Sequence, residues 1–263
     1  MHSEFAGFIR DLARESGKLI GEYFDQPEVA VSLKSDRSPV TQADRRAEEQ
    51  MRAMIRARYP DHGVIGEEFG NENEEAEFVW TLDPIDGTIS FVAGCPLFGT
   101  LIGLLHEGQP LLGAIHQPLL GQLCLGDGQQ TRLNGRPVRV RDIENLSEAI
   151  LLTTDLKYIG KYQNQSGFDR LLALTGLLRT WGDCYGYLLV ATGRADIMLD
   201  PIMNPWDVVP LVPIIRGAGG VITSWTGEAP HPATSSVAAN RAIHPQVIDL
   251  LRAHAEDRSV GEA

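Results

Sequence analysis

The stretch Trp80-Thr81-Leu82-Asp83-Pro84-Ile85-Asp86-Gly87-Thr88 ends an apolar run with two carboxylates, a glycine and a hydroxyl. Asp83 and Asp86 are too close in sequence to share a dry pocket as anions without a counter-charge. Mg2+ is a suitable counter-ion, because proteins usually hold it through one or two carboxylates together with substrate phosphate. Gly87 lets the backbone approach a ligand closely. The stretch therefore indicates a site for metal and phosphate, with an Asx-type turn that caps a helix as the structural alternative.

Two further segments place carboxylates at the end of a strand and at the start of a helix. Glu67 and Glu68 directly follow a short apolar strand signal between glycines. Asp207 stands in the first turn of an apolar helical stretch that opens at Asn204-Pro205-Trp206, where it could also be a plain helix cap. Strand ends are where the sites of α/β proteins gather, so these acids are candidate ligands.

A capping box opens the second predicted helix of the chain. Thr41 is followed three residues later by Asp44, with Asp in place of the usual Glu or Gln. A carboxylate at a helix start also faces whatever lies beyond that end. Asp44 could therefore cap the helix and orient Thr88 at once.

Charge and composition argue against several classes of function. The net charge of −12 disfavours a general nucleic-acid or anionic-membrane surface, since both need stripes of Lys and Arg. The sequence shows no N-terminal targeting segment and no run approaching about 18 apolar residues, so a cytoplasmic location is expected. Cys95, Cys124 and Cys184 form no CxxC pair, which argues against a disulfide framework or a zinc site.

The hydrophobic pattern divides the chain into two halves. In residues 1–145, apolar residues at helical spacing predict two helices, and antiparallel strands follow them. A polar segment that starts at Asp142 marks the predicted border. In residues 146–263, strands and helices alternate, which predicts an α/β half after the α+β half. One predicted helix of this second half contains Pro210 and Pro213, which should distort it or delay its first turns.

Several motifs that span the chain occur together in one order. They are Leu33-Lys34-Ser35, Val40-Thr41-Gln42-Ala43-Asp44, Glu67-Glu68, Asp83-Pro84-Ile85-Asp86-Gly87-Thr88, Leu189-Val190-Ala191-Thr192-Gly193-Arg194-Ala195-Asp196, and Trp206-Asp207 followed by Gly217-Ala218-Gly219-Gly220. This series resembles the inositol monophosphatase family of Mg2+-dependent, lithium-sensitive phosphatases. The resemblance implies an α/β fold built as a layered α-β-α-β-α sandwich. It also implies a small phosphorylated metabolite as substrate and a homodimer. The acidic net charge predicts no nucleic-acid or membrane partner.

The resemblance assigns a role to each matched residue. Glu67, Asp83 and the carbonyl of Ile85 would bind the activating Mg2+, Asp83, Asp86 and Asp207 would hold a second ion, and a third ion could lie near Glu67. Thr88, hydrogen-bonded to Asp44, would position the attacking water and help to deprotonate it, so that Asp44, Thr88 and Glu67 form the catalytic set. The N–H groups of Gly87 and Thr88 would receive phosphate oxygens, and Asp86 would also contact the substrate. Because metal and water suffice, no covalent phosphoenzyme is expected.

Substrate choice is expected to depend on Asp183 and Asp200. Inositol-specific relatives usually carry a small residue at the first position and a glutamate at the second, and this chain departs at both. A carboxylate at Asp183 favours a positively charged substrate over a neutral polyol. With Arg179 upstream, the segment is similar to the histidinol-phosphate phosphatase branch, whose product carries an ammonium and an imidazole. Inositol 1-phosphate is the alternative substrate, and a helix cap is the alternative role of Asp183.

Other functions fit the sequence less well. A bisphosphatase acting on adenosine 3',5'-bisphosphate or fructose 1,6-bisphosphate needs basic residues for a second phosphate, and Lys157, Lys161 and Arg179 are the only nearby candidates by sequence. A non-enzymatic role in transcription complexes, known for some members of the family, would need a basic or apolar docking surface. A metal-dependent pyrophosphatase is disfavoured because the resemblance covers nearly the whole chain.

Overall fold

The computed structural model describes residues 2–24, 31–33 and 39–252. Lys34 and Ser35 of the first motif lie outside the described residues. The helices are α1 (His2–Tyr23), α2 (Gln42–Arg58), α3 (Thr88–Val92), η1 (Leu146–Glu148), η2 (Leu156–Tyr158), α4 (Ile159–Tyr162), α5 (Gln165–Leu174), α6 (Asp183–Ala191), α7 (Pro205–Gly217) and α8 (His244–Arg252), where η marks a 3-10 helix.

The strands belong to three sheets within the described residues. The large sheet has the order β10-β9-β8-β7-β6-β5-β3-β4, the small sheet has the order β12-β11-β13-β15-β14, and β1 pairs with β2. The strands are β1 (Val31–Leu33), β2 (Pro39–Thr41), β3 (Gly63–Gly66), β4 (Gly70–Glu72), β5 (Phe78–Asp86), β6 (Gly99–His106), β7 (Gln109–Gln117), β8 (Gln122–Gly126), β9 (Thr131–Leu133), β10 (Arg136–Val138), β11 (Ile150–Thr153), β12 (Leu177–Arg179), β13 (Ile197–Asp200), β14 (Val221–Thr223) and β15 (Ser236–Ala239).

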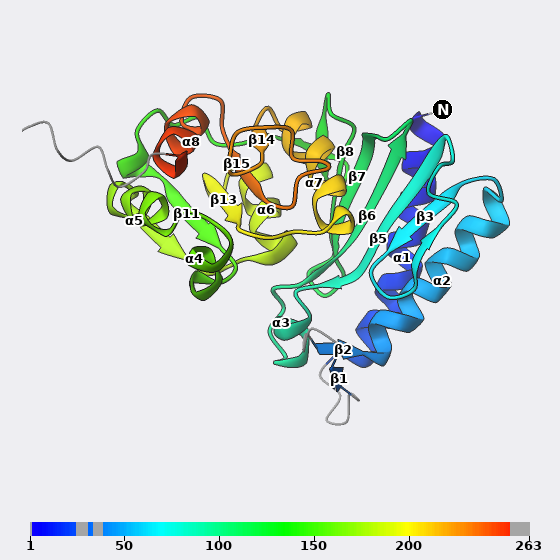
Figure 1. Ribbon diagram of the computed structural model, residues 1–263. Helices are drawn as coiled ribbons and strands as arrows, with labels where there is room; N and C mark the ends of the chain where they lie inside the picture. Colours follow the sequence, from blue (N-terminus) through cyan, green and yellow to red (C-terminus); the bar gives the residue numbers. More distant parts are fainter. Residues whose placement is uncertain (1, 25–30, 34–38, 253–263) are drawn as a thin grey trace, which may run out of the picture.

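The elements stack in five layers, which confirms the predicted α-β-α-β-α sandwich (Figure 1). Helices α1 and α2 cover the outer face of the large sheet, and α6 and α7 lie between the two sheets. Helices α5 and α8 pack together on the outer face of the small sheet. The border predicted between residues 145 and 146 stays a prediction, since residues of both sheets share one core around α6 and α7.

The N-terminal helices form for the reasons that the pattern indicates. Phe5, Ile9 and Leu12 of α1 are buried, as the helical spacing predicts, and Ile20 is buried toward the end of the helix, where Leu19 and Tyr23 are partly buried. The capping box predicted at the start of α2 is present. The Thr41 hydroxyl accepts from the Ala43 N–H, and the Asp44 carboxylate accepts from the Thr41 N–H at 2.8 Å.

Helix α7 lies in a groove that glycines open in the large sheet. A methyl group on Gly113 of β7 or Gly126 of β8 would overlap backbone atoms of α7, and one on Gly103 of β6 would lie 3.0 Å from the Val209 side chain of α7. The helix begins at Pro205 and runs to Gly217, so the delayed start expected from its internal prolines is wrong. Pro205 favours this early start, because a proline at the first helical position already has the helical φ, and the N–H that it lacks would have no partner in the helix.

The small sheet mixes parallel and antiparallel pairs. Strands β12, β11 and β13 are parallel, whereas β15 runs antiparallel to both β13 and β14. Helix α5, which precedes β12, ends at Leu174. Gly176 follows, and the N–H groups of Gly176 and Leu177 both donate to the carbonyl of Ala149, which starts β12 beside β11.

Candidate active site

The end of strand β5 delivers the first two carboxylates of the site. Strand β5 pairs with β6 up to Asp83, and the register then shifts before Asp86. Pro84 lies in this irregularity, and its carbonyl accepts from the buried hydroxyl of Thr100 at 2.8 Å. Bulges of this kind re-aim side chains at the ends of strands. Asp83 and Asp86 are therefore turned toward one place instead of to opposite faces of the sheet.

Helix α7 brings the third carboxylate from about 120 residues farther along the chain. Asp207 is the third residue of α7, and its Oδ2 accepts from the Asn204 N–H at 2.7 Å. The helix-cap role considered for Asp207 is thus real, and it coexists with a place in the cluster. Oxygens of Asp83, Asp86 and Asp207 all lie within 4.8 Å of one another.

Glu67 completes this group from the loop after β3. Its N–H donates to the carbonyl of Leu82 at 3.2 Å, which places Glu67 beside the residue that precedes Asp83. Its carboxylate lies in contact with that of Asp83. The structure therefore brings together the four carboxylates that the motifs single out.

Burial and mutual repulsion make this cluster unfavourable for anions alone. Burial, and then the charges of Glu67, Asp86 and Asp207, raise the pKa of Asp83 well above its ordinary value. The pKa of Asp86 is raised in the same way by burial, Asp183 and Asp207, and burial raises that of Asp207 to about 7. Asp83 Oδ1 is also buried without a hydrogen-bond partner among the described residues. Hard divalent cations satisfy this donor set, so the residues fit a Mg2+ site.

The predicted hydrogen bond between Thr88 and Asp44 is not formed, and this expectation needs correction. The Thr88 hydroxyl donates to the carbonyl of Ile85 at 3.0 Å, a contact three residues back that Ser and Thr side chains commonly make. The Asp44 carboxylate instead accepts from the N–H and hydroxyl of Thr41. Burial raises the pKa of Asp44 to about 6, against the opposing effect of these hydrogen bonds.

Gly87 makes room for the side chain of Asp183 at the start of α3. Gly87 has φ of 91°, a conformation that favours glycine, and a methyl group there would lie 3.0 Å from Asp183 Oδ2. Asp183 is the first residue of α6 and has φ of 49°. Gly182 is the N-cap residue, and no side chain of the described residues caps α6, so the helix-cap role of Asp183 is wrong. Burial, Asp200 and Asp207 raise the pKa of the Asp183 carboxyl to about 7.

Asp200 stands at the end of β13 and shares a partner with Asp183. Thr154 Oγ1 accepts from the Asp183 N–H at 2.8 Å, and Thr154 also hydrogen-bonds to the Asp200 carboxylate. Tyr187, buried in α6, donates its hydroxyl to Asp200 Oδ2 at 3.0 Å. Burial raises the pKa of Asp200 to about 6, although both hydroxyl partners lower it.

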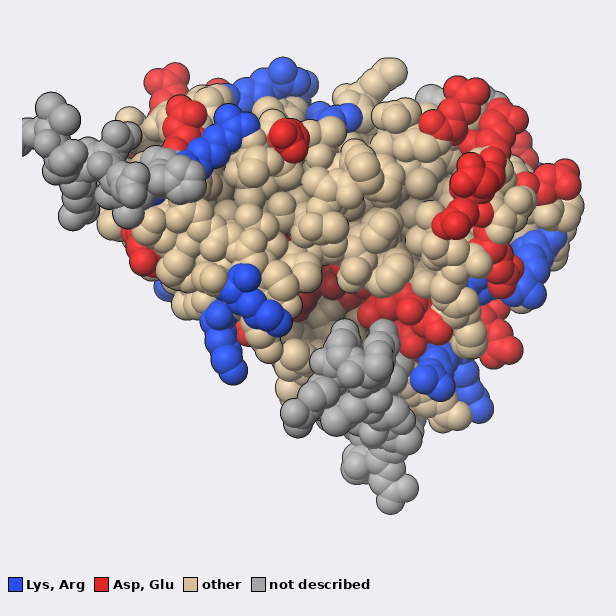
Figure 2. Space-filling model, viewed as in Figure 1, with Lys and Arg blue, Asp and Glu red and all other residues tan. Residues whose placement is uncertain are grey.

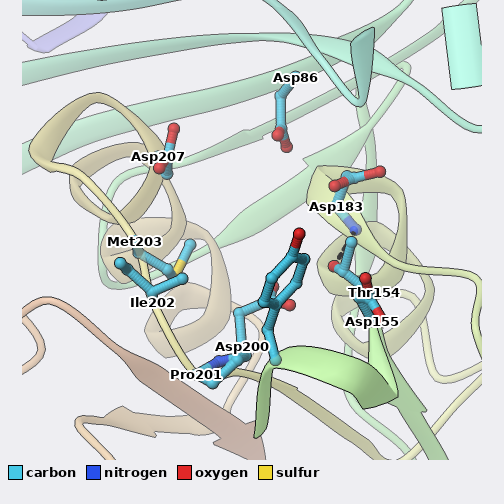
Figure 3. A pocket seen from close by; sticks show the side chains of 10 residues that line it. Asp86, Thr154, Asp155, Asp183, Asp200, Pro201, Ile202, Met203 and Asp207 are labelled. Carbon is cyan, nitrogen blue, oxygen red and sulfur yellow. Dashed lines mark hydrogen bonds between the residues drawn. The ribbon is translucent and has the colours of Figure 1, made fainter. Parts of the chain in front are cut away.

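These side chains surround one cavity of about 180 Å³. Figure 3 shows Asp86, Asp183, Asp200 and Asp207 on different sides of it, and Figure 2 shows acidic side chains gathered in a hollow beneath α7. The lining residues are Asp86, Thr154, Asp155, Tyr158, Asp183, Asp200, Pro201, Ile202, Met203 and Asp207. Within the described part of the chain, none of the lining residues is Lys or Arg, so the cavity is suited to cationic groups and to phosphate carried with metal.

Arg179 is not brought to this cavity. It lies exposed on β12, where Nη1 donates to the carbonyl of Leu178 and the guanidinium lies 5.9 Å from the ring centre of Trp181. Conversely, Thr154, Asp155 and Tyr158 line the cavity without having been predicted. The rule that sites gather at strand ends could have found the first two, because they directly follow β11, which ends at Thr153.

Comparisons with known proteins place nearly the whole chain in one family. The sequence profile of the inositol monophosphatase family matches residues 1–256. A histidinol-phosphatase of Chlorobaculum parvum is 40% identical over 250 residues, with 94% of this chain and 96% of that protein covered. The chloroplastic bifunctional phosphatase IMPL2 of Arabidopsis thaliana is also 40% identical, over 263 residues and 75% of its length. The structure of an inositol monophosphatase from Zymomonas mobilis superposes with a TM-score of 0.86 at 32% identity, with 96% and 99% of the two chains covered.

The described helices give no sign of a membrane span. None of them is both long enough and apolar enough to cross a bilayer.

Proposed function

Since the chain belongs to the inositol monophosphatase family, a family of phosphatases, we propose that it is a Mg2+-dependent phosphomonoesterase that converts L-histidinol phosphate to L-histidinol and phosphate. The observation that carries this choice is the composition of the cavity. Asp86 and Asp207 of the metal cluster line it together with two further carboxylates, Asp183 and Asp200, and no basic residue is among the described lining residues.

The carboxylates of Asp183 and Asp200 match the chemistry of this leaving group. Histidinol carries an ammonium and an imidazole, both of which can donate hydrogen bonds to carboxylates. Charge-assisted hydrogen bonds are about twice as strong as neutral ones, and more so in a cavity that excludes water. A neutral polyol would leave the buried charge of Asp183 uncompensated. The name of one relative at 40% identity, a histidinol-phosphatase, supports the same choice.

The metal ligands would be Glu67, Asp83, the carbonyl of Ile85, Asp86 and Asp207. Mg2+ bound there would supply a water of lowered pKa and neutralise charge on the phosphate during in-line displacement. The number of ions, two or three, stays a prediction from the family resemblance, as do lithium sensitivity and the homodimer. The cytoplasmic location stays a prediction from the sequence.

The chain's own groups would orient the phosphate and move the proton. The N–H groups of Gly87 and Thr88 begin α3 beside Asp86, where they can receive phosphate oxygens. The Thr88 hydroxyl would hold the attacking water, and the proton would pass to Asp44. This role requires the Thr88 hydroxyl to exchange its present acceptor, the carbonyl of Ile85, for the Asp44 carboxylate.

A panel of substrates tests the proposal. Phosphate release would be measured with Mg2+ on L-histidinol phosphate, inositol 1-phosphate, fructose 1,6-bisphosphate and adenosine 3',5'-bisphosphate at equal concentrations. We expect the highest kcat/KM on histidinol phosphate. Turnover of inositol 1-phosphate without turnover of histidinol phosphate would establish the alternative substrate. Absence of turnover on all four esters would favour the non-enzymatic role.

A further inference from the structure

A buried ion pair on α2 lies directly beneath the loop that carries Glu67. Glu48 and Arg52 are 0% and 1% exposed, and Arg52 Nε lies 2.7 Å from Glu48 Oε1. Burying two charges costs free energy unless their remaining hydrogen-bonding atoms also find partners. The buried pair is therefore expected to have further hydrogen-bond partners, which exposed ion pairs of α2 do not need.

The partners of this pair include backbone groups within residues 67–70, which we name the Glu67 loop, and Arg52 Nη1 also lies 3.2 Å from Glu72 Oε1. Glu48 Oε2 accepts from the Glu68 N–H at 2.7 Å, and Glu48 Oε1 accepts from the Phe69 N–H at 3.2 Å. Arg52 donates through Nη2 to the carbonyl of Gly70. Three consecutive residues after Glu67 are thus held by one ion pair, through charge-assisted hydrogen bonds.

The other side of Glu67 is fixed equally closely. A methyl group on Gly66 would overlap the Glu48 carboxylate, so Glu48 lies directly against the backbone that precedes Glu67. The Glu67 N–H donates to the carbonyl of Leu82 on β5. The loop is therefore held between α2 and the strand that carries Asp83.

We propose that Glu48 and Arg52 are positioning residues that hold the Glu67 carboxylate against Asp83 and thereby set the affinity of the site for its metal ion. Two carboxylates in contact repel each other, so a loop without other restraints would move Glu67 away into solvent. The hydrogen bonds from the Glu67 loop to the buried pair oppose that movement. The inference rests on the proposed function, because it assumes that this site holds a divalent cation.

The test is Mn2+ binding measured by titration calorimetry without substrate, on the wild-type chain and on Glu48→Gln. Glutamine keeps the size of the side chain but presents an NH2 group to donors that need an acceptor. We expect the dissociation constant for Mn2+ to rise about 10–100-fold, the usual effect of removing a group that orients a ligand.

A matched control separates positioning from general stability. Asp196 is a buried carboxylate that accepts from the Arg141 guanidinium at 2.6 Å and from the Ile150 N–H at 2.8 Å, at the end of β13 opposite Asp200. Asp196→Asn removes the same kind of interaction far from the cluster. It should lower Tm as Glu48→Gln does and leave the affinity for Mn2+ unchanged.

Arg52→Lys serves as the second variant if Glu48→Gln does not fold. A single ammonium cannot reproduce the fork that reaches Glu48 and the Gly70 carbonyl together, so weaker Mn2+ binding is again expected. Wild-type affinity in a folded variant overturns the inference alone. A wild-type chain that binds no Mn2+ overturns the inference together with the metal-dependent function, whereas failure on every ester of the substrate panel leaves the binding comparison intact.

Discussion

Asp83 is the residue on which the metal cluster depends most. It is 3% exposed, contacts Glu67, and has an oxygen without a hydrogen-bond partner among the described residues. Asp83→Asn should abolish Mg2+-dependent phosphate release. In a chelator its Tm should not fall, because the substitution removes a buried charge that its neighbours repel. Phosphate release and Tm would be measured together, with the exposed Asp169→Asn as control. Normal turnover by Asp83→Asn would refute the assignment of the site.

Asp183 is the residue that should distinguish a positively charged substrate from a neutral one. Asp183→Asn keeps the side-chain shape, and Asn tolerates the positive φ of this position, so the backbone is preserved. Losing one hydrogen bond to a charged group costs about 1.5–3 kcal/mol, which corresponds to a rise of roughly 10–100-fold in KM for histidinol phosphate. The KM for inositol 1-phosphate should stay the same or fall. Equal effects of the substitution on both substrates would show that Asp183 does not distinguish charge.

At the scale of elements, the position of α7 ties packing to the metal site. A methyl group on Gly113 would overlap the carbonyl of Pro210. Because the overlapped atom belongs to the backbone, rotation of a side chain cannot relieve the clash. Gly113→Ala should therefore destabilise the protein by about 1–3 kcal/mol and weaken Mg2+ binding, because α7 carries Asp207. Urea unfolding and metal titration would measure the two effects. A variant with unchanged stability would contradict the close approach.

Gly7 in α1 provides the matched control for this substitution. A methyl group there would meet nothing within 4 Å. Gly7→Ala should therefore stabilise the protein by up to about 1 kcal/mol through helix propensity alone, without change in metal affinity.

The elements also show where prediction from sequence succeeds and where it stops. The helices α1 and α2 follow from their apolar spacing, and the place of Asp207 follows from a helix start with Asn and Pro. The partner of Thr88 could not be predicted, because a hydroxyl can choose a carbonyl three residues back over a carboxylate distant in sequence. Arg179 failed as a site residue because β12 pairs at the edge of the small sheet, and strand order is a tertiary property.

At the scale of the whole molecule, two sheets and the helices between them make the site from segments far apart in sequence. Glu67 and Asp83 come with the large sheet, Asp200 with the small sheet, and Asp183 and Asp207 with the helices between them. Residue types and motif spacing could indicate which acids matter. They could not show that Thr154 joins Asp183 to Asp200, because that contact depends on how β11 and β13 pair beside α6.

The stability of the whole protein should depend on pH in a way that Mg2+ reverses. Burial raises the pKa of Asp44 and Asp200 to about 6, and that of Asp183 and Asp207 to about 7. A carboxyl whose pKa is raised on folding contributes stability that is fully present below its unfolded pKa of about 3.9 and is lost as pH rises through about 6–7. Of these groups, Asp207 is a proposed metal ligand, and metal competes with protons for its oxygens, so the stabilising effect of metal should grow as pH rises through about 7.

The matching measurement is Tm in Mg2+ minus Tm in chelator, taken from pH 5 to pH 8. The buried His116, whose pKa is lowered to about 4, acts in the opposite sense, because it favours the folded state less as pH falls below about 6.5. That contribution is present with and without metal, so it cancels in the difference. The difference should therefore rise with pH through about 7, and a difference that is constant over this range would show that protons and metal do not share the carboxylate cluster.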